Sequence, residues 1–304
     1  RDRPDLCDYS IQHCNPQRPA TYVRGTGNRR RWEITIHPDE DAMAATEPDR
    51  IWSLLARWIT PQDADIERAA VYTFHSAIAK QWRNGRLFLA GDSAHQTPPF
   101  LGQGMCAGIR DAANLAWKLW HVVRGRADHG LLDTYQSERA PHVREYIELA
   151  IRLGGLINTK AMAAGLAAGV PRQDAPAKLD VRTPLLGPGL SAGDTGLVGR
   201  LAPQFTLSDG GRSDDRVGYA FALLADASFA GALSPRERAA LATAGVAVLG
   251  SDEAAGLSAW LSQNDIAAAL VRPDRYLLRT VRCDRDFAEL LAALNNTARV
   301  PPVA

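Results

Sequence analysis

The order of apolar and polar residues predicts regular elements from the start of the chain. Apolar residues between 32 and 36 alternate with polar ones, and a period of two is typical of a half-buried strand, here stopped by Pro38. A helix is expected to start at Thr46, which can cap it, because the apolar residues that follow recur at helical spacing. The apolar run at residues 69–74 predicts another strand.

The middle of the sequence predicts a buried strand followed by long helices. Residues 87–90 form a short apolar run before Gly91, which indicates a buried strand. After a loop rich in Pro and Gly, apolar residues recur at helical spacing as far as Gly125, so a long helix is expected. A second helical region is expected from residue 131 to 158, with Pro141 opening a new helix or kinking this one.

A linker and a small α/β domain are expected after these helices. Residues 171–194 contain several Pro and Gly residues without a periodic pattern, so the domain boundary is placed there. The Ser234–Glu237 segment is a capping box that opens a helix, with Pro at the first helical position. Strands are expected at 219–224, 246–249, 266–271 and 276–281, and a closing helix at 284–294.

Composition narrows the classes of function. Hydrophobic residues make up 46% and charged residues 23% of the 304 residues, as in soluble globular proteins. The formal net charge is +1, and no apolar run reaches the roughly 20 residues that span a bilayer, so neither nucleic acid nor membrane is expected as a partner. The four cysteines form no CxxC pair and no metal-like spacing, which indicates free thiols in the cytoplasm and no metal site.

Candidate chemistry is concentrated where the expected strand at 87–90 gives way to the long helix. Asp92 follows that strand, where open α/β sheets place ligands, and its carboxylate can accept hydrogen bonds from the hydroxyl groups of a polyol. Gly102 and Gly104 precede the helix, whose N-terminus favours an anion such as a reduced flavin ring. A plain turn and an ordinary helix entry would explain each motif alone, but their order and spacing together favour a cofactor site.

The same segment carries a family resemblance. Gly85-Arg86-Leu87-Phe88-Leu89-Ala90-Gly91-Asp92-Ser93-Ala94-His95, Pro98-Pro99, Gly102-Gln103-Gly104 and the run from Asp111 to Leu119 closely resemble the second flavin fingerprint of class A flavoprotein hydroxylases. That group includes para-hydroxybenzoate hydroxylase, phenol hydroxylase and polyketide aromatic hydroxylases. The stretch from Pro98 to Asp111 looks most like the 3-(3-hydroxyphenyl)propionate hydroxylase branch, and Arg30 to Glu33 also resembles it.

The resemblance implies a fold class and a domain plan. The expected fold is α/β, the latter part of a para-hydroxybenzoate-hydroxylase-like FAD-binding fold followed by a thioredoxin-like domain. Residues 1–80 would end the substrate-binding sheet region, 81–170 would form the C-terminal part of the FAD-binding domain, 171–194 the linker and 195–304 the thioredoxin-like domain. This last domain lacks CxxC, so it is expected to be structural and to support a homodimer.

Residue roles follow from the resemblance. Asp92 would hold the FAD ribityl chain, residues 102–106 would contact the isoalloxazine through their backbone, and Arg31 would approach the flavin. The full expected cofactor set is Gly91, Asp92, Pro98, Gly102, Gln103, Gly104, Met105, Cys106 and Arg31. The substrate would be lined by His75, Thr97 and Phe100, although surface exposure or loop packing explains these three equally well. His95 could act as an acid or base, but a loop histidine held by backbone contacts is favoured.

The implied activity is that of an FAD-dependent monooxygenase. It would hydroxylate a phenolic substrate similar to 3-(3-hydroxyphenyl)propionate, using NAD(P)H and O2, with the chemistry at the flavin C4a position and no catalytic side chain. Relatives begin with a G-x-G-x-x-G strand that is absent here, so a missing N-terminal half or a companion chain is expected. The alternatives are a polyketide-tailoring or Baeyer–Villiger monooxygenase, or a non-catalytic fragment or partner chain.

Overall fold

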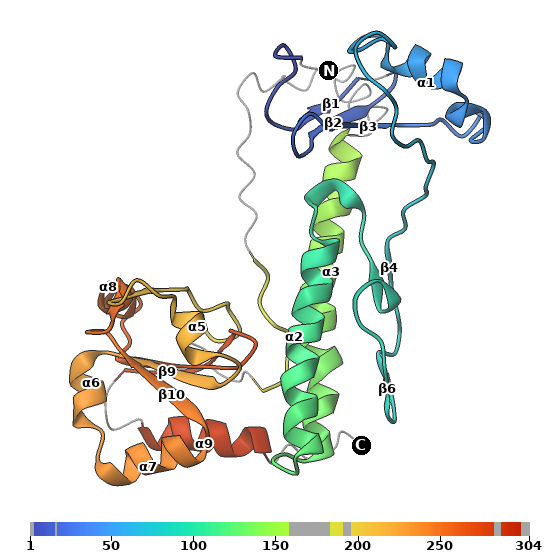
Figure 1. Cartoon of the computed structure of the whole chain (residues 1–304). Coiled ribbons are helices and arrows are strands. Elements are labelled where there is room, and N and C mark those ends of the chain that lie inside the picture. Colours follow the sequence, from blue (N-terminus) through green and yellow to red (C-terminus); the bar gives the residue numbers. More distant parts are fainter. Residues whose placement is uncertain (1–2, 16, 158–182, 191–195, 283–286, 299–304) are drawn as a thin grey trace, which may run out of the picture. The chain divides into compact units, whose positions relative to one another are not determined.

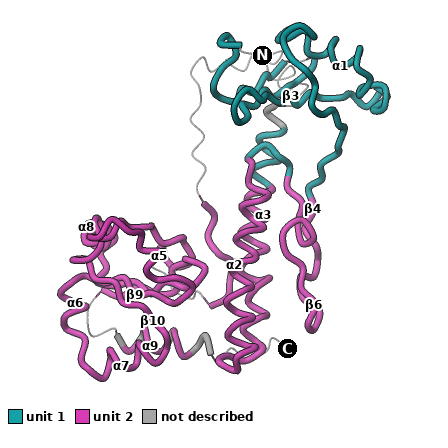
Figure 2. Tube along the Cα trace, viewed as in Figure 1, with its two compact units in different colours: residues 1–76, 98–101, 148–180 teal, residues 77–97, 102–147, 181–304 magenta. Residues whose placement is uncertain are grey.

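Short strands, small helices and two long helices make up the chain in the computed structural model, which describes residues 3–15, 17–157, 183–190, 196–282 and 287–298 (Figure 1). The chain divides into two units (Figure 2). Unit 1 comprises residues 1–76, 98–101 and 148–180, and unit 2 comprises residues 77–97, 102–147 and 181–304. Each unit is described by itself.

Unit 1 is built on a three-stranded antiparallel sheet in the order β1-β2-β3. Its elements are β1 (Ile11–His13), β2 (Ala20–Arg24), β3 (Arg30–Ile34), η1 (Ala44–Thr46) and α1 (Pro48–Leu55). Tyr22 on β2 is buried, its ring lies 5.4 Å from that of Trp32, and its hydroxyl donates to the carbonyl oxygen of Cys7 at 2.8 Å. The strand and the helix predicted here from periodicity are therefore present, with ends shifted by a few residues.

Two expectations for unit 1 are wrong. The N-cap of α1 is Glu47, and Thr46 does not cap it because its hydroxyl donates to the carbonyl oxygen of Met43 at 2.8 Å. Residues 69–74 form no strand and are exposed. An apolar run forms a strand only where a neighbouring strand takes up its backbone hydrogen bonds, and no described segment pairs with this one.

Unit 2 begins with two short antiparallel pairings that lead to the candidate site. They are formed by β4 (Ala77–Ile78) with β7 (His95–Gln96), and by β5 (Arg83–Asn84) with β6 (Leu87–Phe88), while η2 (Gly91–Ser93) lies between β6 and β7. The expectation of a buried strand at 87–90 is wrong. Only two of its residues are paired, Leu87 is 75% exposed, and among the described residues no strand pairs with the other edge of β6.

The two long helices follow. After η3 (Pro99–Leu101), α2 (Gly104–Val123) has Arg124 as its C-cap, and Gly125 follows in the left-handed conformation with φ of 65°, as expected of a helix end. After η4 (His129–Asp133), α3 (Thr134–Ile157) continues through Pro141, so this proline does not open a new helix. The two helices share an apolar cluster with the segment before them, and Trp82, Leu132 and Tyr135 belong to it.

The last part of unit 2 has the strand order of a thioredoxin-like domain. Its sheet runs β10-β9-β12-β13, with β9 and β10 parallel and β12 antiparallel to both of its neighbours. The elements are β8 (Thr206–Leu207), α5 (Ser213–Val217), β9 (Phe221–Ala225), α6 (Ala227–Ala232), α7 (Pro235–Thr243), β10 (Val246–Gly250), β11 (Ala254–Ala255), α8 (Leu257–Gln263), β12 (Ala268–Val271), β13 (Leu277–Val281) and α9 (Phe287–Ala298). The four strands and the closing helix predicted from the sequence are present.

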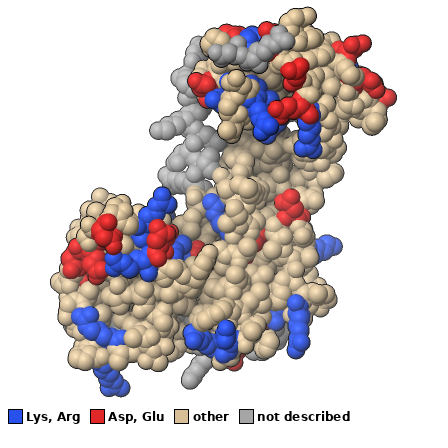
Figure 3. Space-filling model, in the orientation of Figure 1, with Lys and Arg blue, Asp and Glu red and all other residues tan. Residues whose placement is uncertain are grey.

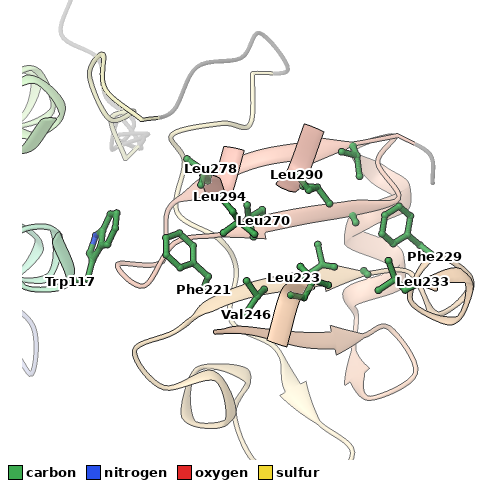
Figure 4. Packing of buried hydrophobic residues seen from close by; sticks show 14 of the residues in the cluster. Trp117, Phe221, Leu223, Phe229, Leu233, Val246, Leu270, Leu278, Leu290 and Leu294 are labelled. Carbon is green, nitrogen blue, oxygen red and sulfur yellow. The ribbon is translucent and has the colours of Figure 1, made fainter. Parts of the chain in front are cut away.

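Burial explains why this sheet forms. All five residues of β9 and all four of β12 are buried, because apolar clusters cover both faces of the sheet. The predicted capping box starts α7: Ser234 accepts from the backbone of Glu237, whose carboxylate accepts from the backbone of Ser234 at 2.7 Å. One cluster extends to α2, where Trp117 meets Phe221 of β9 edge-on with ring centroids 5.5 Å apart (Figure 4). The sheet and α2 therefore share a core.

Most of the expected linker, 171–194, lies outside the described residues, and its described part, 183–190, forms neither helix nor strand. There the amide of Gly187 donates to the carbonyl oxygen of Glu138 on α3 at 2.8 Å. Among the residues that the structure describes, no helix is both long enough and apolar enough to cross a membrane.

Candidate functional site

The turn formed by residues 91–95, called the 91–95 turn below, lies directly on α2. Gly91 adopts φ of 58°, a left-handed conformation that favours glycine. A methyl group added at Gly108 on α2 would lie 3.3 Å from the Cα of Gly91, so the two backbones meet where neither carries a side chain. The next residue, Asp92, is exposed, and its carboxylate has no hydrogen-bond partner among the described residues. The turn thus presents a free acceptor beside the helix.

The start of α2 is open in the same unit. Gln103 is the N-cap, but its side chain does not cap the helix backbone, and its amide oxygen instead accepts from the side chain of Arg110 on the same helix at 3.3 Å. Gly102 has φ of 62°, and a methyl group added at Gly102 or Gly104 would meet nothing within 4 Å. The first N–H groups of a twenty-residue helix therefore lack a side-chain cap, and they carry the positive end of its dipole.

A buried carboxylate beneath the 91–95 turn holds both of its ends. Asp111 on α2 is fully buried, and its Oδ2 accepts from the backbone N–H of Gly91 at 3.1 Å and lies 2.6 Å from Nε2 of His95. Its Oδ1 accepts from Nε of Arg139 on α3 at 2.8 Å, and Arg139 is also fully buried. We call His95, Asp111 and Arg139 the Asp111 network. His95 is therefore held by a side-chain carboxylate, and the expectation of backbone contacts is wrong.

Charge keeps Asp111 ionised in this interior. Burial alone would raise the pKa of Asp111, but the bond from His95 and the positive charge of Arg139 outweigh burial and lower it. Two buried nitrogens of the network, Nδ1 of His95 and Nη1 of Arg139, have no hydrogen-bond partner among the described atoms. The ring of His95 lies 5.4 Å from that of Trp82, so the histidine is packed as part of the core.

A second set of buried charges connects both long helices to the thioredoxin-like domain. It comprises Asn114 and Lys118 on α2, Glu138 on α3, and Arg272 and Asp274 between β12 and β13, and we call it the Glu138 network. Lys118 donates to Glu138 at 2.7 Å, and both nitrogens of the Arg272 fork donate to Glu138 at 2.8 Å. The charged side chains that form the ion pairs are all 0% exposed, so the charges balance one another away from water.

The pKa values in the Glu138 network reflect this balance. Burial lowers the pKa of Lys118 to about 8, although Glu138 acts to raise it. Burial would raise the pKa of Glu138, but Arg272 and Lys118 together lower it far below its usual range. A third buried group lies nearby: Nε2 of His142 on α3 is 3.2 Å from the hydroxyl of Tyr276, and burial, followed by the charge of Arg139, lowers the pKa of His142 to about 3.

The outward face of α2 is apolar. Its exposed residues recur at helical spacing and include Met105 at 75%, Ile109 at 60% and Val123 at 80% exposure. We call this set the α2 stripe, and its members are Met105, Ile109, Ala112, Ala116, Trp120 and Val123. Figure 3 shows that the surface over α2 carries few charged side chains. Two of the three charged residues of α2, Asp111 and Lys118, are buried, while apolar residues are exposed.

The residues predicted from the sequence fall into both units. Unit 2 holds those of the 91–95 turn and the start of α2, together with the half-buried Cys106 and Thr97. Unit 1 holds Arg31, His75, Pro98 and Phe100. Arg31 is exposed and pairs with Glu33 at 2.8 Å, His75 is exposed, Pro98 is buried, and the ring of Phe100 meets that of Phe74 edge-on at 5.4 Å. The geometry of the candidate site therefore rests on the residues of unit 2.

The residues of unit 2 fit a flavin. A free carboxylate at Asp92 suits the hydroxyl groups of a ribityl chain, because it only accepts hydrogen bonds. The uncapped N-terminus of α2 suits the electron-rich edge of the ring system. Gly102 and Gly104 have no side chains, and the space that a side chain would fill is open. A flat group can therefore approach the backbone there.

Comparisons with known proteins point to the same class. Residues 13–150 match the family model described as FAD binding domain. The probable NADH-specific resorcinol 4-hydroxylase of Rhodococcus jostii (strain RHA1) is 36% identical over 324 residues, which covers 99% of this chain and 60% of that protein. The 3-(3-hydroxy-phenyl)propionate/3-hydroxycinnamic acid hydroxylase of Mycobacterium avium (strain 104) is 46% identical over 161 residues, covering 51% of this chain and 28% of that protein. Over its matched residues the chain is similar to FAD-dependent aromatic hydroxylases.

Solved structures confirm the fold expected from the family resemblance. Aklavinone-11 hydroxylase, crystallised with FAD and aklavinone, matches with a TM-score of 0.68 and 25% identity, covering 93% of this chain and 57% of that chain. The flavin-dependent monooxygenase PieE, crystallised with FAD and substrate, matches with a TM-score of 0.69 and 23% identity, covering 93% of this chain and 60% of that chain. The fold is thus para-hydroxybenzoate-hydroxylase-like. The chain spans about 60% of the length of the resorcinol hydroxylase that it matches.

Sequence reasoning missed the two buried networks. Asp111 and Lys118 were part of the family resemblance, but neither was given a role. A signal for them exists: Asp111, Asn114 and Lys118 recur at positions i, i+3 and i+7, which places three polar residues on one face of α2. The sequence pattern shows that this face is polar but does not show that it is buried.

Proposed function

We propose that this chain supplies the ribityl-binding and ring-binding part of an FAD-dependent monooxygenase. The enzyme would hydroxylate a phenolic substrate similar to 3-(3-hydroxyphenyl)propionate, with NAD(P)H and O2 as co-substrates. The observation that carries the proposal is the free carboxylate of Asp92 on a turn that lies against α2, a helix whose N-terminus has no side-chain cap. Both features lie in the segment that matches the FAD binding domain family.

The chain would contribute binding and orientation. Asp92 would accept hydrogen bonds from ribityl hydroxyl groups, and the first N–H groups of α2 would stabilise negative charge on the flavin ring. Gly102 and Gly104 would let the ring approach the backbone. When bound, reduced FAD activates O2 for transfer of one oxygen atom to an electron-rich ring. No described side chain is needed as a nucleophile in that chemistry.

The phenolic substrate class is favoured over larger polyketides by similarity. The relatives named as resorcinol or 3-hydroxyphenylpropionate hydroxylases are 36% to 47% identical over their matched residues, whereas the polyketide hydroxylase structures are 25% identical or less. The longest of these matches is to the resorcinol hydroxylase, and resorcinol is therefore the second compound to be tested.

Asp92→Ala tests the flavin assignment directly. The 304-residue chain is titrated with FAD and with riboflavin, which lacks the ADP part, and flavin fluorescence and the visible spectrum report binding. The removal of a charge-assisted acceptor should weaken binding of both flavins about ten-fold or more, because such a bond contributes about 1.5–3 kcal/mol. The matched control is Asp215→Asn, an exposed carboxylate in the thioredoxin-like domain. Equal affinity of Asp92→Ala and wild type would refute the assignment.

The same proposal includes a companion part that carries the ADP-binding glycines. The α2 stripe supports it, since a row of exposed apolar side chains on one long helix is typical of a covered surface. The resorcinol hydroxylase is long enough to contain such a part, because this chain spans only about 60% of its length. The stripe would pack against this part, whether it belongs to the same polypeptide or to another one.

Reconstitution tests the companion and the activity together. A polypeptide with the unmatched part of the resorcinol hydroxylase is co-expressed with this chain, and co-purification, bound flavin and NAD(P)H oxidation with 3-hydroxyphenylpropionate or resorcinol are measured. Ile109→Asp on the stripe should abolish co-purification, while Ile151→Asp, an exposed change on α3, should not. Co-purification that survives Ile109→Asp would contradict the role of the stripe. A flavin complex that oxidises NAD(P)H without forming an oxygenated product would contradict the hydroxylase assignment.

A further inference from the structure

The Asp111 network shows how the turn that carries Asp92 is held in place. One oxygen atom of Asp111, Oδ2, contacts both ends of this turn. It accepts a hydrogen bond from the backbone N–H of Gly91 and lies 2.6 Å from Nε2 of His95. Gly91 also starts η2, whose N-cap residue Ala90 has no side-chain bond of its own. A carboxylate from α2, twenty residues along the chain, therefore does the capping that a neighbouring side chain ordinarily does.

The second oxygen of Asp111 ties the turn to α3. Oδ1 accepts from Nε of Arg139, and a further nitrogen of Arg139 lies 3.4 Å from the carbonyl oxygen of Ala107 on α2. The side chains of His95, Asp111 and Arg139 are all 0% exposed, so water cannot replace any of these bonds. The contact of Gly91 with Gly108 adds a steric limit to the same turn.

We propose that Asp111, supported by His95 and Arg139, is a positioning residue that fixes the 91–95 turn and thereby holds Asp92 in place for the flavin. The inference rests on the proposed function for the part that concerns the flavin. Asp92 has no partner of its own, so its place depends on the backbone on either side of it. That backbone is bonded to Asp111 at residue 91 and through the side chain of residue 95.

The variant Asp111→Asn tests the positioning role with little change of shape. An amide has one oxygen, whereas the buried carboxylate accepts on both sides. If the amide oxygen faces the turn, the NH2 group meets Nε–H of Arg139, and if it faces Arg139, the NH2 group meets the N–H of Gly91. One donor then faces another in either orientation. The double variant Asp111→Asn/Arg139→Gln supplies an acceptor opposite the NH2 group and should restore part of the effect.

Two measurements are made on the 304-residue chain. Hydrogen exchange of residues 89–96 reports the turn without flavin, and titration with riboflavin and FAD reports binding. In Asp111→Asn, the backbone amides of Gly91 and Ala94 should exchange at least ten-fold faster than in wild type. The variant should also bind both flavins at least ten-fold more weakly. The double variant should recover at least a third of the loss in affinity, on a logarithmic scale, which a merely structural defect would not do.

Glu138→Gln is the matched control, because it removes one buried carboxylate from the same helix pair without touching the turn. Compared at equal distance below each unfolding midpoint, it should leave exchange at residues 91–94 and flavin affinity within two-fold of wild type. If Asp111→Asn yields no folded protein, His95→Phe keeps an aromatic ring beside Trp82 and removes only the Nε2 contact. It should then speed exchange at Ala94 at least three-fold.

The outcomes separate the two proposals. Normal exchange at residues 91–94 in Asp111→Asn would overturn the positioning role whatever the flavin does. Faster exchange with unchanged flavin affinity would overturn its link to the cofactor, while weaker binding by Asp92→Ala would leave the proposed function standing. A wild-type chain that binds neither riboflavin nor FAD, alone or with its companion, would overturn the proposed function, and faster exchange in Asp111→Asn would still show that Asp111 holds the turn.

Discussion

Glu138→Gln should be the most damaging single change to stability in unit 2. The carboxylate of Glu138 accepts from Asn114, Lys118, Arg272 and the backbone N–H of Leu190, and both of its oxygens are used. The network holds two cations, Lys118 and Arg272, and two anions, Glu138 and Asp274, so its charges cancel. The amide would leave one uncompensated positive charge and would turn an NH2 group toward donors.

The size of the effect follows from the burial. Breaking a buried ion pair by removing one partner costs about 3–5 kcal/mol, because the other charge stays in the interior. For a folding unit of this size each kcal/mol lowers the midpoint of thermal unfolding by about 2–4 °C, so a fall of about 6–20 °C is expected. Lys118→Met removes a cation whose pKa burial already lowers to about 8. Adding this change to Glu138→Gln restores neutrality, so the double variant should be more stable than the sum of the single effects by about 1–2 kcal/mol.

Urea and thermal unfolding followed by circular dichroism measure these differences. Glu145→Gln on the exposed side of α3 is the matched control, and its effect should stay within about 0.5 kcal/mol. A loss below about 1 kcal/mol for Glu138→Gln would refute the reasoning, since it would mean that water or another anion replaces the carboxylate. Strictly additive single and double variants would refute the electrostatic part of it.

Two further predictions concern α2 and α3. Since burial and then Arg139 lower the pKa of His142 to about 3 from an ordinary 6.5, the unfolded chain binds a proton in that window and the folded one does not. The free energy of unfolding should therefore fall with decreasing pH from 6.5 to 3, by up to about 1.4 kcal/mol per pH unit from this group, and His142→Phe should remove that part of the slope in unfolding series at several pH values. Gly108→Ala should weaken riboflavin binding about ten-fold despite better helix propensity, because the added methyl group would press on Gly91. Gly231→Ala is the control, since its methyl group would meet open space and should leave the affinity unchanged. Equal riboflavin affinities of Gly108→Ala and wild type would argue against close contact of the turn with α2.

The elements that the sequence predicts correctly are those whose evidence is local. The periodicity of α2, the glycine after its end and the capping box at Ser234 all act over a few residues, and each is present in the structure. The prediction of a buried strand at 87–90 is wrong because burial is not a local property. The segment is apolar, but whether it is buried depends on which other segments cover it. No described segment covers Leu87, which is exposed.

The buried networks depend on contacts between distant parts of the chain. Glu138 and Arg272 are 134 residues apart, and Asp111 meets Arg139 across 28 residues and His95 across 16. No local pattern pairs such residues. What the sequence does contain is a polar face on α2, formed by Asp111, Asn114 and Lys118. A single sequence shows that this face is polar, but only the packing of α3 and the β12–β13 turn shows that it is buried.

The two networks are joined by consecutive residues of α3. Glu138 faces Arg272 of the thioredoxin-like domain, while the next residue, Arg139, faces Asp111 beneath the 91–95 turn. Any shift of α3 that keeps one network intact must therefore disturb the other, because both side chains are fixed by buried bonds at about 2.8 Å. The thioredoxin-like domain carries no CxxC pair, yet its Arg272, held by Asp274, contacts Glu138 of α3 directly. The Arg272 contact therefore stabilises the packing of α3, and its loss should leave the 91–95 turn in place as long as Arg139 keeps its bond to Asp111.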